Sequence, residues 1–144
     1  VLTLLDIKQR PWHKGLILIA SDFNQINDFV APLSSDILQQ LEATWPGPVT
    51  WVLPARETTP AYLTGDHDSI AIRVTAHPIA KQLCDAVGHA LVSTSANLAG
   101  LPPAKYHRQV RWQLPEINTI VHGQCGDADK PSQIRDALTG QILR

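Results

Sequence analysis

Short apolar runs alternate with helical repeats along this chain, and that alternation constrains the fold more than any other feature. Runs rich in apolar and branched residues predict strands at 16–20, 49–53, 69–75, 90–93 and 119–122. Apolar residues three or four positions apart predict helices at 1–10, 24–30, 34–45, 77–87 and 106–114. Such alternation is typical of an α/β domain. A hairpin predicted for 132–137 and 141–144 adds antiparallel pairing, so we expect an open mixed sheet with flanking helices.

The same pattern predicts which side of one helix faces the core. Within 77–87, apolar residues recur every four positions at Ile79, Leu83 and Val87. Gly88 follows and should end the helix, because glycine readily adopts the left-handed conformation found just past helix ends. We expect those three side chains to point inward. Residues 123–131 are predicted to form a polar loop.

Length and composition limit the class of protein. The chain has 144 residues, which predicts a single domain spanning 1–144. A net charge of −1 gives no global argument for nucleic-acid binding. No apolar run approaches the roughly 18 residues that span a bilayer. Two cysteines, Cys84 and Cys125, predict a reduced cytoplasmic protein with free thiols. The chain lacks methionine and opens inside a helical pattern, so we expect the domain to be N-terminally incomplete.

Three cations cluster around the first proline. Lys8, Arg10 and Lys14 lie close together at the end of the first predicted helix. A guanidinium presents a planar fork of donors and an ammonium a compact charge, so together they suit a polyphosphate. The alternative is an ordinary solvated helix end, where cations meet the negative end of the helix dipole.

A polar cluster follows one of the predicted buried strands. Ser93-Thr94-Ser95-Ala96-Asn97 comes directly after the 90–93 run. Ligands of open α/β sheets bind beyond the carboxyl ends of strands, so we expect this cluster to contact one. Helix caps and side-chain turns are the alternative interpretation. With the cations, the cluster predicts one site for a phosphorylated ligand.

Other charged and polar residues extend this hypothesis. Arg73 lies on the strand face opposite Ile72 and Val74, so it either contacts a ligand or forms a structural ion pair. In the hairpin, alternation places Ser132 and Asp136 on one face and Arg135 on the other. The histidines show no metal-binding spacing, and the chain has no Ser-His-Asp arrangement or Walker loop. We therefore expect a site that works by positioning and charge.

Five motifs give the chain a resemblance to a known family. They are Lys8-Gln9-Arg10-Pro11, Trp45-Pro46-Gly47-Pro48-Val49-Thr50, Ile70-Ala71-Ile72-Arg73-Val74, Ser93-Thr94-Ser95-Ala96-Asn97 and Asp136-Ala137-Leu138-Thr139-Gly140. In order and spacing they resemble the YrdC/TsaC family of threonylcarbamoyl-AMP synthases, in its short bacterial type. The resemblance implies a twisted open α/β sheet with a concave, positively charged face. It also implies that L-threonine, bicarbonate and ATP give threonylcarbamoyl-adenylate and pyrophosphate, a nucleotidyl transfer that supplies a tRNA-modifying complex acting on adenosine 37.

The resemblance also implies residue roles. The phosphate-contacting catalytic residues would be Lys8 and Arg10. Nucleotide binding would fall to Lys14, Thr50, Ser93, Ser95, Asn97 and Arg144. Threonine binding would fall to Ser132 and Arg73. Mg²⁺ is expected with ATP, held largely by phosphate oxygens and water.

This chain departs from the family pattern in part. The family's N-terminal helix, its strand with a Pro-Thr-Glu motif and its glycine-bearing turn have no counterpart here, and that segment contributes to the threonine site. Ile19 and Pro54 stand where longer relatives place polar contacts.

Two alternatives to a synthase remain open. The first is a nucleotide- or RNA-binding module without catalysis, for which Lys105, Arg108 and Arg111 could extend a basic surface toward tRNA or double-stranded RNA. The second is a carbamoyl-transfer accessory domain of the kind found in hydrogenase-maturation proteins. The lack of zinc-finger cysteine pairs argues against it.

Overall fold

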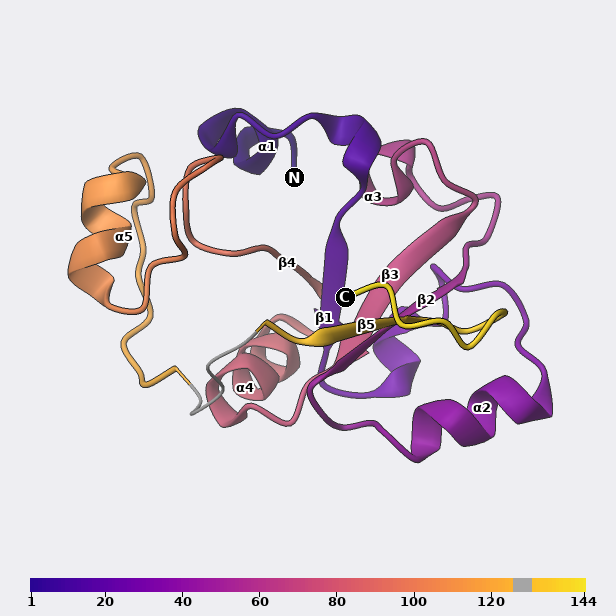
Figure 1. The fold of residues 1–144 in the computed structure, drawn as a ribbon. Helices are drawn as coiled ribbons and strands as arrows, with labels where there is room; N and C mark the ends of the chain where they lie inside the picture. The colour runs from indigo at the N-terminus through magenta and orange to yellow at the C-terminus, as the bar shows by residue number, and fades with distance from the viewer. Residues whose placement is uncertain (126–130) are drawn as a thin grey trace.

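A computed structural model describes residues 1–125 and 131–144 of the chain (Figure 1). Its helices are α1 (Leu2–Lys8), η1 (Trp12–Lys14), η2 (Phe23–Ile26), α2 (Ser35–Glu42), α3 (Ala61–Thr64), α4 (Pro78–Val87) and α5 (His107–Gln113), where η marks a 3₁₀ helix. Its strands are β1 (Ile17–Ala20), β2 (Val49–Pro54), β3 (Ser69–Val74), β4 (Leu91–Ser93) and β5 (Gln133–Asp136). The predicted loop 123–131 falls partly outside the described residues.

The strands form one open sheet in the order β4-β1-β3-β2-β5. β1 runs parallel to β3, and β2 runs parallel to β5. The β1–β4 and β2–β3 pairs are antiparallel. The predicted mixed α/β sheet is therefore confirmed. The terminal hairpin also forms, since the Leu143 amide donates to the Ile134 carbonyl at 2.8 Å, although its return arm pairs only through an isolated bridge.

One face of this sheet carries the core and the other stays open. Side chains alternate in β3, where Ile70 and Ile72 are buried while Ala71 and Arg73 are only half-buried. β1 repeats the pattern. Residues from α1, η2, α2 and α3 pack into the same buried core: Leu5, Ile26, Leu41 and Leu63. The helices thus leave half-buried side chains on the opposite face, where a ligand can reach the strands.

The inward face predicted for the 77–87 helix is wrong. Leu83 and Val87 are 37% and 47% exposed, and the buried residue of α4 is Cys84. The Cys84 thiol reaches the Ile19 carbonyl at 3.5 Å, so a small side chain makes the contact with β1. Periodicity predicts a helix correctly, but tertiary contacts decide which stripe turns inward. Gly88 does end the helix, with φ of 76°.

Two further expectations need correction. Residues 119–122 form no strand, and within the described residues β4 and β5 remain the edges of the sheet. A strand needs a hydrogen-bonding neighbour, and an apolar pair such as Ile120-Val121 does not supply one. The helix expected at 24–30 shortens to the 3₁₀ turn η2, capped by the Asp22 carboxylate.

The structure also addresses the thiols and the membrane. Cys84 and Cys125 are both free, as predicted. Within the described ranges, every helix is too short or too polar to cross a bilayer.

Candidate functional site

The open face of the sheet holds three adjoining clefts that meet at Arg10. The central cleft, of about 390 Å³, is lined by Arg10, Thr50, Arg73, Ser93, Thr94, Ser95, Ser132 and Arg144, among others. A lateral cleft of about 440 Å³ shares Arg10 and Arg144 and adds Lys14 and His67. A small cleft of about 130 Å³ adds Lys8 and Asn97. All ten residues predicted for the site therefore line one continuous region, although they come from distant parts of the sequence.

The end of α1 aims the first cations at this region. Gln9 adopts a left-handed conformation, with φ of 49°, and the Arg10 amide donates back to the Leu5 carbonyl at 2.9 Å. This closure satisfies carbonyls at the helix end and reverses the chain before Pro11. Arg10 is then held by a bond from its Nη2 to the Gly15 carbonyl at 3.0 Å.

Lys8 joins α1 to the loop that follows β4. Its Nζ donates to the main-chain carbonyls of Ser95 and Asn97, the latter at 2.7 Å, and lies 3.5 Å from Asn97 Oδ1. Only 7% of Lys8 is exposed. This burial, together with the charge of Arg10, lowers the pKa of the Lys8 ammonium. An ammonium has three donors, and this loop occupies them, so Lys8 fixes the loop's backbone.

The Ser93–Asn97 loop also carries bonds of its own. The Ser95 hydroxyl donates to Asn97 Oδ1 at 2.6 Å, and Asn97 Nδ2 donates to the Leu101 carbonyl at 2.6 Å. Side-chain turns, the alternative considered for this cluster, are therefore present. The loop nevertheless lines the cleft with Ser93, Thr94 and Ser95. Both interpretations describe the same segment, which is held rigid by local bonds and presents hydroxyls to the cavity.

Arg73 has no acidic partner among the described residues. Its Nε is buried without a hydrogen bond, and across the described residues the one ion pair joins Lys81 to Asp85 at 3.2 Å. The alternative of a structural ion pair for Arg73 is therefore wrong for this part of the chain. Burial lowers the pKa of the Arg73 guanidinium, which keeps its charge because an arginine pKa starts so high. Arg10 Nε is likewise buried and unpartnered.

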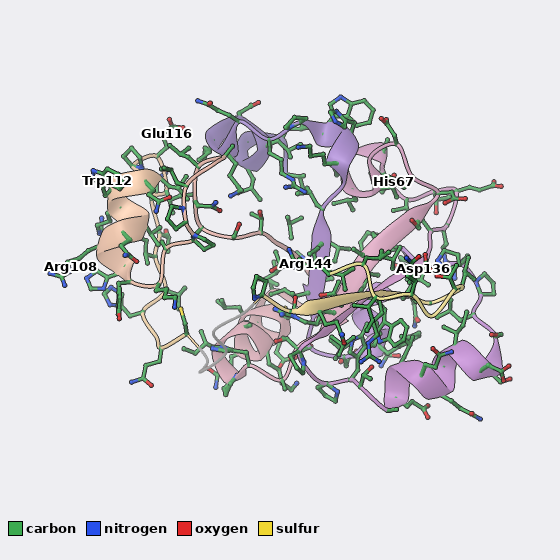
Figure 2. All side chains as sticks on the ribbon, in the orientation of Figure 1. His67, Arg108, Trp112, Glu116, Asp136 and Arg144 are labelled. Atoms are coloured by element: carbon green, nitrogen blue, oxygen red, sulfur yellow. The ribbon has the colours of Figure 1, made fainter. Side chains whose placement is uncertain are left out.

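The opposite wall of the central cleft comes from β2 and the hairpin. Parallel pairing of β2 with β5 brings Thr50 Oγ1 within 3.3 Å of Ser132 Oγ. Arg144 Nη2 donates to the Ser132 carbonyl at 3.4 Å, and Figure 2 shows Arg144 over the middle of the sheet. As predicted, Arg135 lies on the other face, where its guanidinium sits 5.7 Å from the centre of the Trp51 ring.

Among the described residues, the charge in the central cleft has one sign. Arg10, Arg73 and Arg144 line the cleft, and no Asp or Glu of the described ranges does. An anion bound among these guanidiniums would be attracted by all three charges. The donor forks and the neighbouring hydroxyls suit phosphate or carboxylate oxygens. The arrangement therefore favours a polyanionic ligand.

The lateral cleft contains residues that the sequence did not single out for the site. His67 and Ser69 line it beside Lys14, and Asp136 lies at its wall. The Asp136 carboxylate accepts the amides of Leu138 and Thr139 at 2.9 and 2.8 Å, so its role there is to hold the hairpin turn. His67 follows a loop without regular spacing, and nothing in its sequence context indicates that it would face this cleft.

Comparison with known proteins gives a consistent result. The family model for the Sua5/YciO/YrdC domain, described as telomere recombination, matches residues 1–144. A threonylcarbamoyl-AMP synthase of Nitrosococcus oceani is 51% identical over 142 residues, covering 98% of this chain and 77% of that protein. One from Klebsiella pneumoniae is 49% identical over 146 residues, covering all of this chain and 77% of that protein.

A solved structure extends the comparison to three dimensions. The crystal structure of P. abyssi Sua5 complexed with L-threonine superposes with a TM-score of 0.89 at 28% sequence identity. The match covers 99% of this chain, which spans 43% of that Sua5 chain. The sheet order, the cationic open face and these matches agree, and the chain belongs to the Sua5/YciO/YrdC family.

Proposed function

We propose that this chain carries the site of an L-threonylcarbamoyl-AMP synthase. The observation that carries the proposal is the central cleft, which three arginines, several hydroxyl-bearing residues and, within the described ranges, no Asp or Glu line. Relatives about 50% identical to the chain bear that name. The activity is a nucleotidyl transfer, and its substrates would be ATP, L-threonine and bicarbonate.

The reaction needs positioning and charge more than a protein nucleophile. The threonine amine and bicarbonate form a carbamate with loss of water. A carbamate oxygen then attacks the α-phosphorus of ATP, a new P–O bond forms, and the bond to pyrophosphate breaks. Negative charge shifts toward the leaving pyrophosphate. Preorganised cations lower the energy of such a transition state without having to reorganise.

The cleft that each residue lines suggests its role in binding the substrates. Arg10 and Lys14, at the junction of the clefts, would hold the phosphates, while Lys8 would keep the Ser93–Asn97 loop in place. Thr50, Ser93 and Ser95 would orient the nucleotide and carbamate, with Arg144 at the nucleotide. Arg10, Thr50, Ser93, Ser95 and Arg144 all line the central cleft, and Lys14 lines the adjoining lateral cleft.

Threonine would occupy the part of the central cleft between Arg73 and Ser132. A guanidinium suits the threonine carboxylate, and the Ser132 hydroxyl can bond the substrate's polar groups. Arg73 and Ser132 both line this cleft.

Mg²⁺ would enter with the triphosphate. In the described ranges, no group of three or more His, Cys, Asp or Glu residues could hold a metal ion. The donor set here suits phosphate better than a metal, so the ion would keep phosphate and water ligands. The adenylate product would then pass to a tRNA-modifying complex.

The test is a threonine-dependent assay of this chain with ATP, bicarbonate and Mg²⁺. Pyrophosphate release would be followed together with mass-spectrometric detection of threonylcarbamoyl-adenylate. We expect both products only when threonine and bicarbonate are present, and a loss of at least tenfold in Arg10→Ala. Arg108→Ala, a charge removal on the exposed surface of α5, is the matched control and should retain activity.

The alternative of a binding module gives a different result in the same assay. ATP would bind, but no threonine-dependent product would form. Any RNA binding by the surface around Lys105, Arg108 and Arg111 would weaken steeply with salt, because phosphate contacts release counterions.

A further inference from the structure

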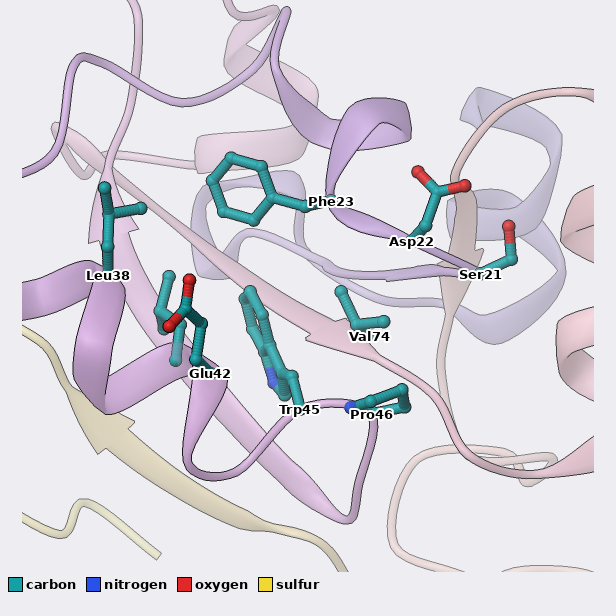
Figure 3. Close-up of a pocket in the computed structure, with 9 residues that line it drawn as sticks. Ser21, Asp22, Phe23, Leu38, Glu42, Trp45, Pro46 and Val74 are labelled. Atoms are coloured by element: carbon teal, nitrogen blue, oxygen red, sulfur yellow. The ribbon is translucent and has the colours of Figure 1, made fainter.

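Another pocket, the rear pocket, lies on the buried side of the sheet, away from the three cationic clefts. It has a volume of about 410 Å³ and lies among the end of β1, η2, α2 and the turn before β2 (Figure 3). β3 separates the two sites, because Arg73 lines the central cleft while the next residue, Val74, lines this pocket. Alternating side chains point to opposite faces of a sheet, so a ligand in one site does not touch a ligand in the other.

The walls of this rear pocket are apolar and fixed. Figure 3 shows the rings of Phe23 and Trp45 on opposite sides of the hollow, with Leu38 and Val74 flanking it. The Trp45 indole is held by a bond from Nε1 to the Val49 carbonyl at 2.8 Å. The volume of the rear pocket falls in the range of small-molecule sites, which combine apolar walls with a few polar groups.

The polar groups of the rear pocket carry negative charge. Asp22 and Glu42 line it, no cationic residue does, and neither carboxylate forms an ion pair within the described residues. The Asp22 Oδ1 atom caps η2 by accepting the Asn24 amide at 2.7 Å, which holds this carboxylate in place.

We propose that the rear pocket binds a small organic cation with an apolar or aromatic body and a protonated amine. The body would pack between the Phe23 and Trp45 rings, whose faces attract cations. The ammonium would lie at the end of the pocket beside Asp22, which the η2 cap holds in place, while Glu42 at the other end adds further negative charge. Nucleotides and other anions are excluded by the same carboxylates. The two faces of the sheet therefore select ligands of opposite charge.

The experiment compares three probes that share a phenyl ring. Phenethylamine carries a positive charge, 3-phenylpropionate a negative one and 2-phenylethanol none. Binding is titrated by chemical-shift changes of the tryptophan indole N–H signals. We expect saturable shifts of the Trp45 signal with phenethylamine and at least tenfold weaker binding of the other two. Excess ATP should leave the phenethylamine shifts in place.

Variants locate the binding and test the charge. Asp22→Asn with Glu42→Gln keeps size and capping but removes both charges, so it should weaken phenethylamine at least tenfold and abolish its preference over 2-phenylethanol. Leu38→Trp fills the pocket from an exposed position and should block all three probes. Glu57→Gln, on an exposed turn outside the pocket, should change nothing.

Several results would overturn the proposal. These are equal binding of the three probes, no saturable shift, displacement by ATP, or unchanged binding in the double charge variant or in Leu38→Trp. Far-ultraviolet circular dichroism of each variant confirms that any loss of binding comes from a folded protein.

Discussion

At the scale of single residues, the hydrogen-bond partners of each charged side chain decide whether the fold or a ligand compensates its charge. Lys8 keeps its charge in a buried position because main-chain carbonyls accept hydrogen bonds from it. Arg73 is half-buried, and its Nε has no hydrogen-bond partner among the described residues. The fold therefore compensates the charge of Lys8, whereas the charge of Arg73 is left for a ligand to compensate. The two residues should therefore respond differently to substitution.

Lys8→Ala should reduce kcat/KM for ATP by ten- to one-hundredfold. The change leaves the Ser95 and Asn97 carbonyls without their donor, and a charge-assisted hydrogen bond contributes about 1.5–3 kcal/mol. The Ser93–Asn97 loop would then lose its fixed position, which amide hydrogen exchange of residues 93–97 reports. Lys105→Ala is the control. Normal protection of that loop in Lys8→Ala would show that Lys8 does not position it.

Arg73→Met should raise the free energy of unfolding by about 1 kcal/mol while abolishing threonine-dependent activity. A half-buried charge without an acidic partner among the described residues costs stability, and an apolar side chain of similar length removes that cost. Urea denaturation of the ligand-free protein measures the effect. A loss of stability in this variant would mean that Arg73 has a stabilising partner in the ligand-free protein, so its charge would not be unpaired.

At the scale of elements, Gly15 and Gly65 fix the junction that carries Arg10 and Lys14. Gly65 has φ of 68°, and a Cβ there would collide with the His13 carbonyl oxygen and the Gly15 nitrogen. This close approach packs α3 against η1 and so sets where the first cations stand.

Gly65→Ala should therefore destabilise the fold by about 3 kcal/mol or more, since backbone atoms cannot move aside as a side chain can. Gly88→Ala is the matched control, because its φ of 76° is similar but its Cβ would meet nothing within 4 Å. That variant should cost only the left-handed penalty of about 1–2 kcal/mol. Equal losses in thermal denaturation would contradict the role of the junction.

The elements also show what a sequence can predict. The runs of β1, β2 and β3 and the repeats of α2 and α4 are local patterns, and all five elements form. The prediction that Leu83 and Val87 of α4 point inward was wrong, because the buried side of this helix depends on how closely Cys84 approaches β1. The strand expected at 119–122 was wrong because pairing needs a neighbour that local pattern cannot supply.

At the scale of the whole molecule, the sheet separates two chemical environments. The open face gathers cations from α1, β3 and the C-terminal hairpin, and the covered face holds the core and the acidic rear pocket. The residues that line the clefts could be predicted from the family motifs and from the polar cluster after a strand. Their contacts could not, since Lys8 meets Asn97 across 89 positions of sequence. The position of His67 in the lateral cleft likewise could not be predicted, because it depends on how the chain folds.

The most direct test of the account is calorimetric titration of ATP into this chain at low and at high salt. The cationic open face predicts saturable binding that weakens as salt increases, competes with pyrophosphate and drops at least tenfold in Arg10→Ala but not in Arg108→Ala. If ATP does not bind, or if its affinity changes neither with salt nor with the Arg10 substitution, these clefts do not hold a nucleoside triphosphate.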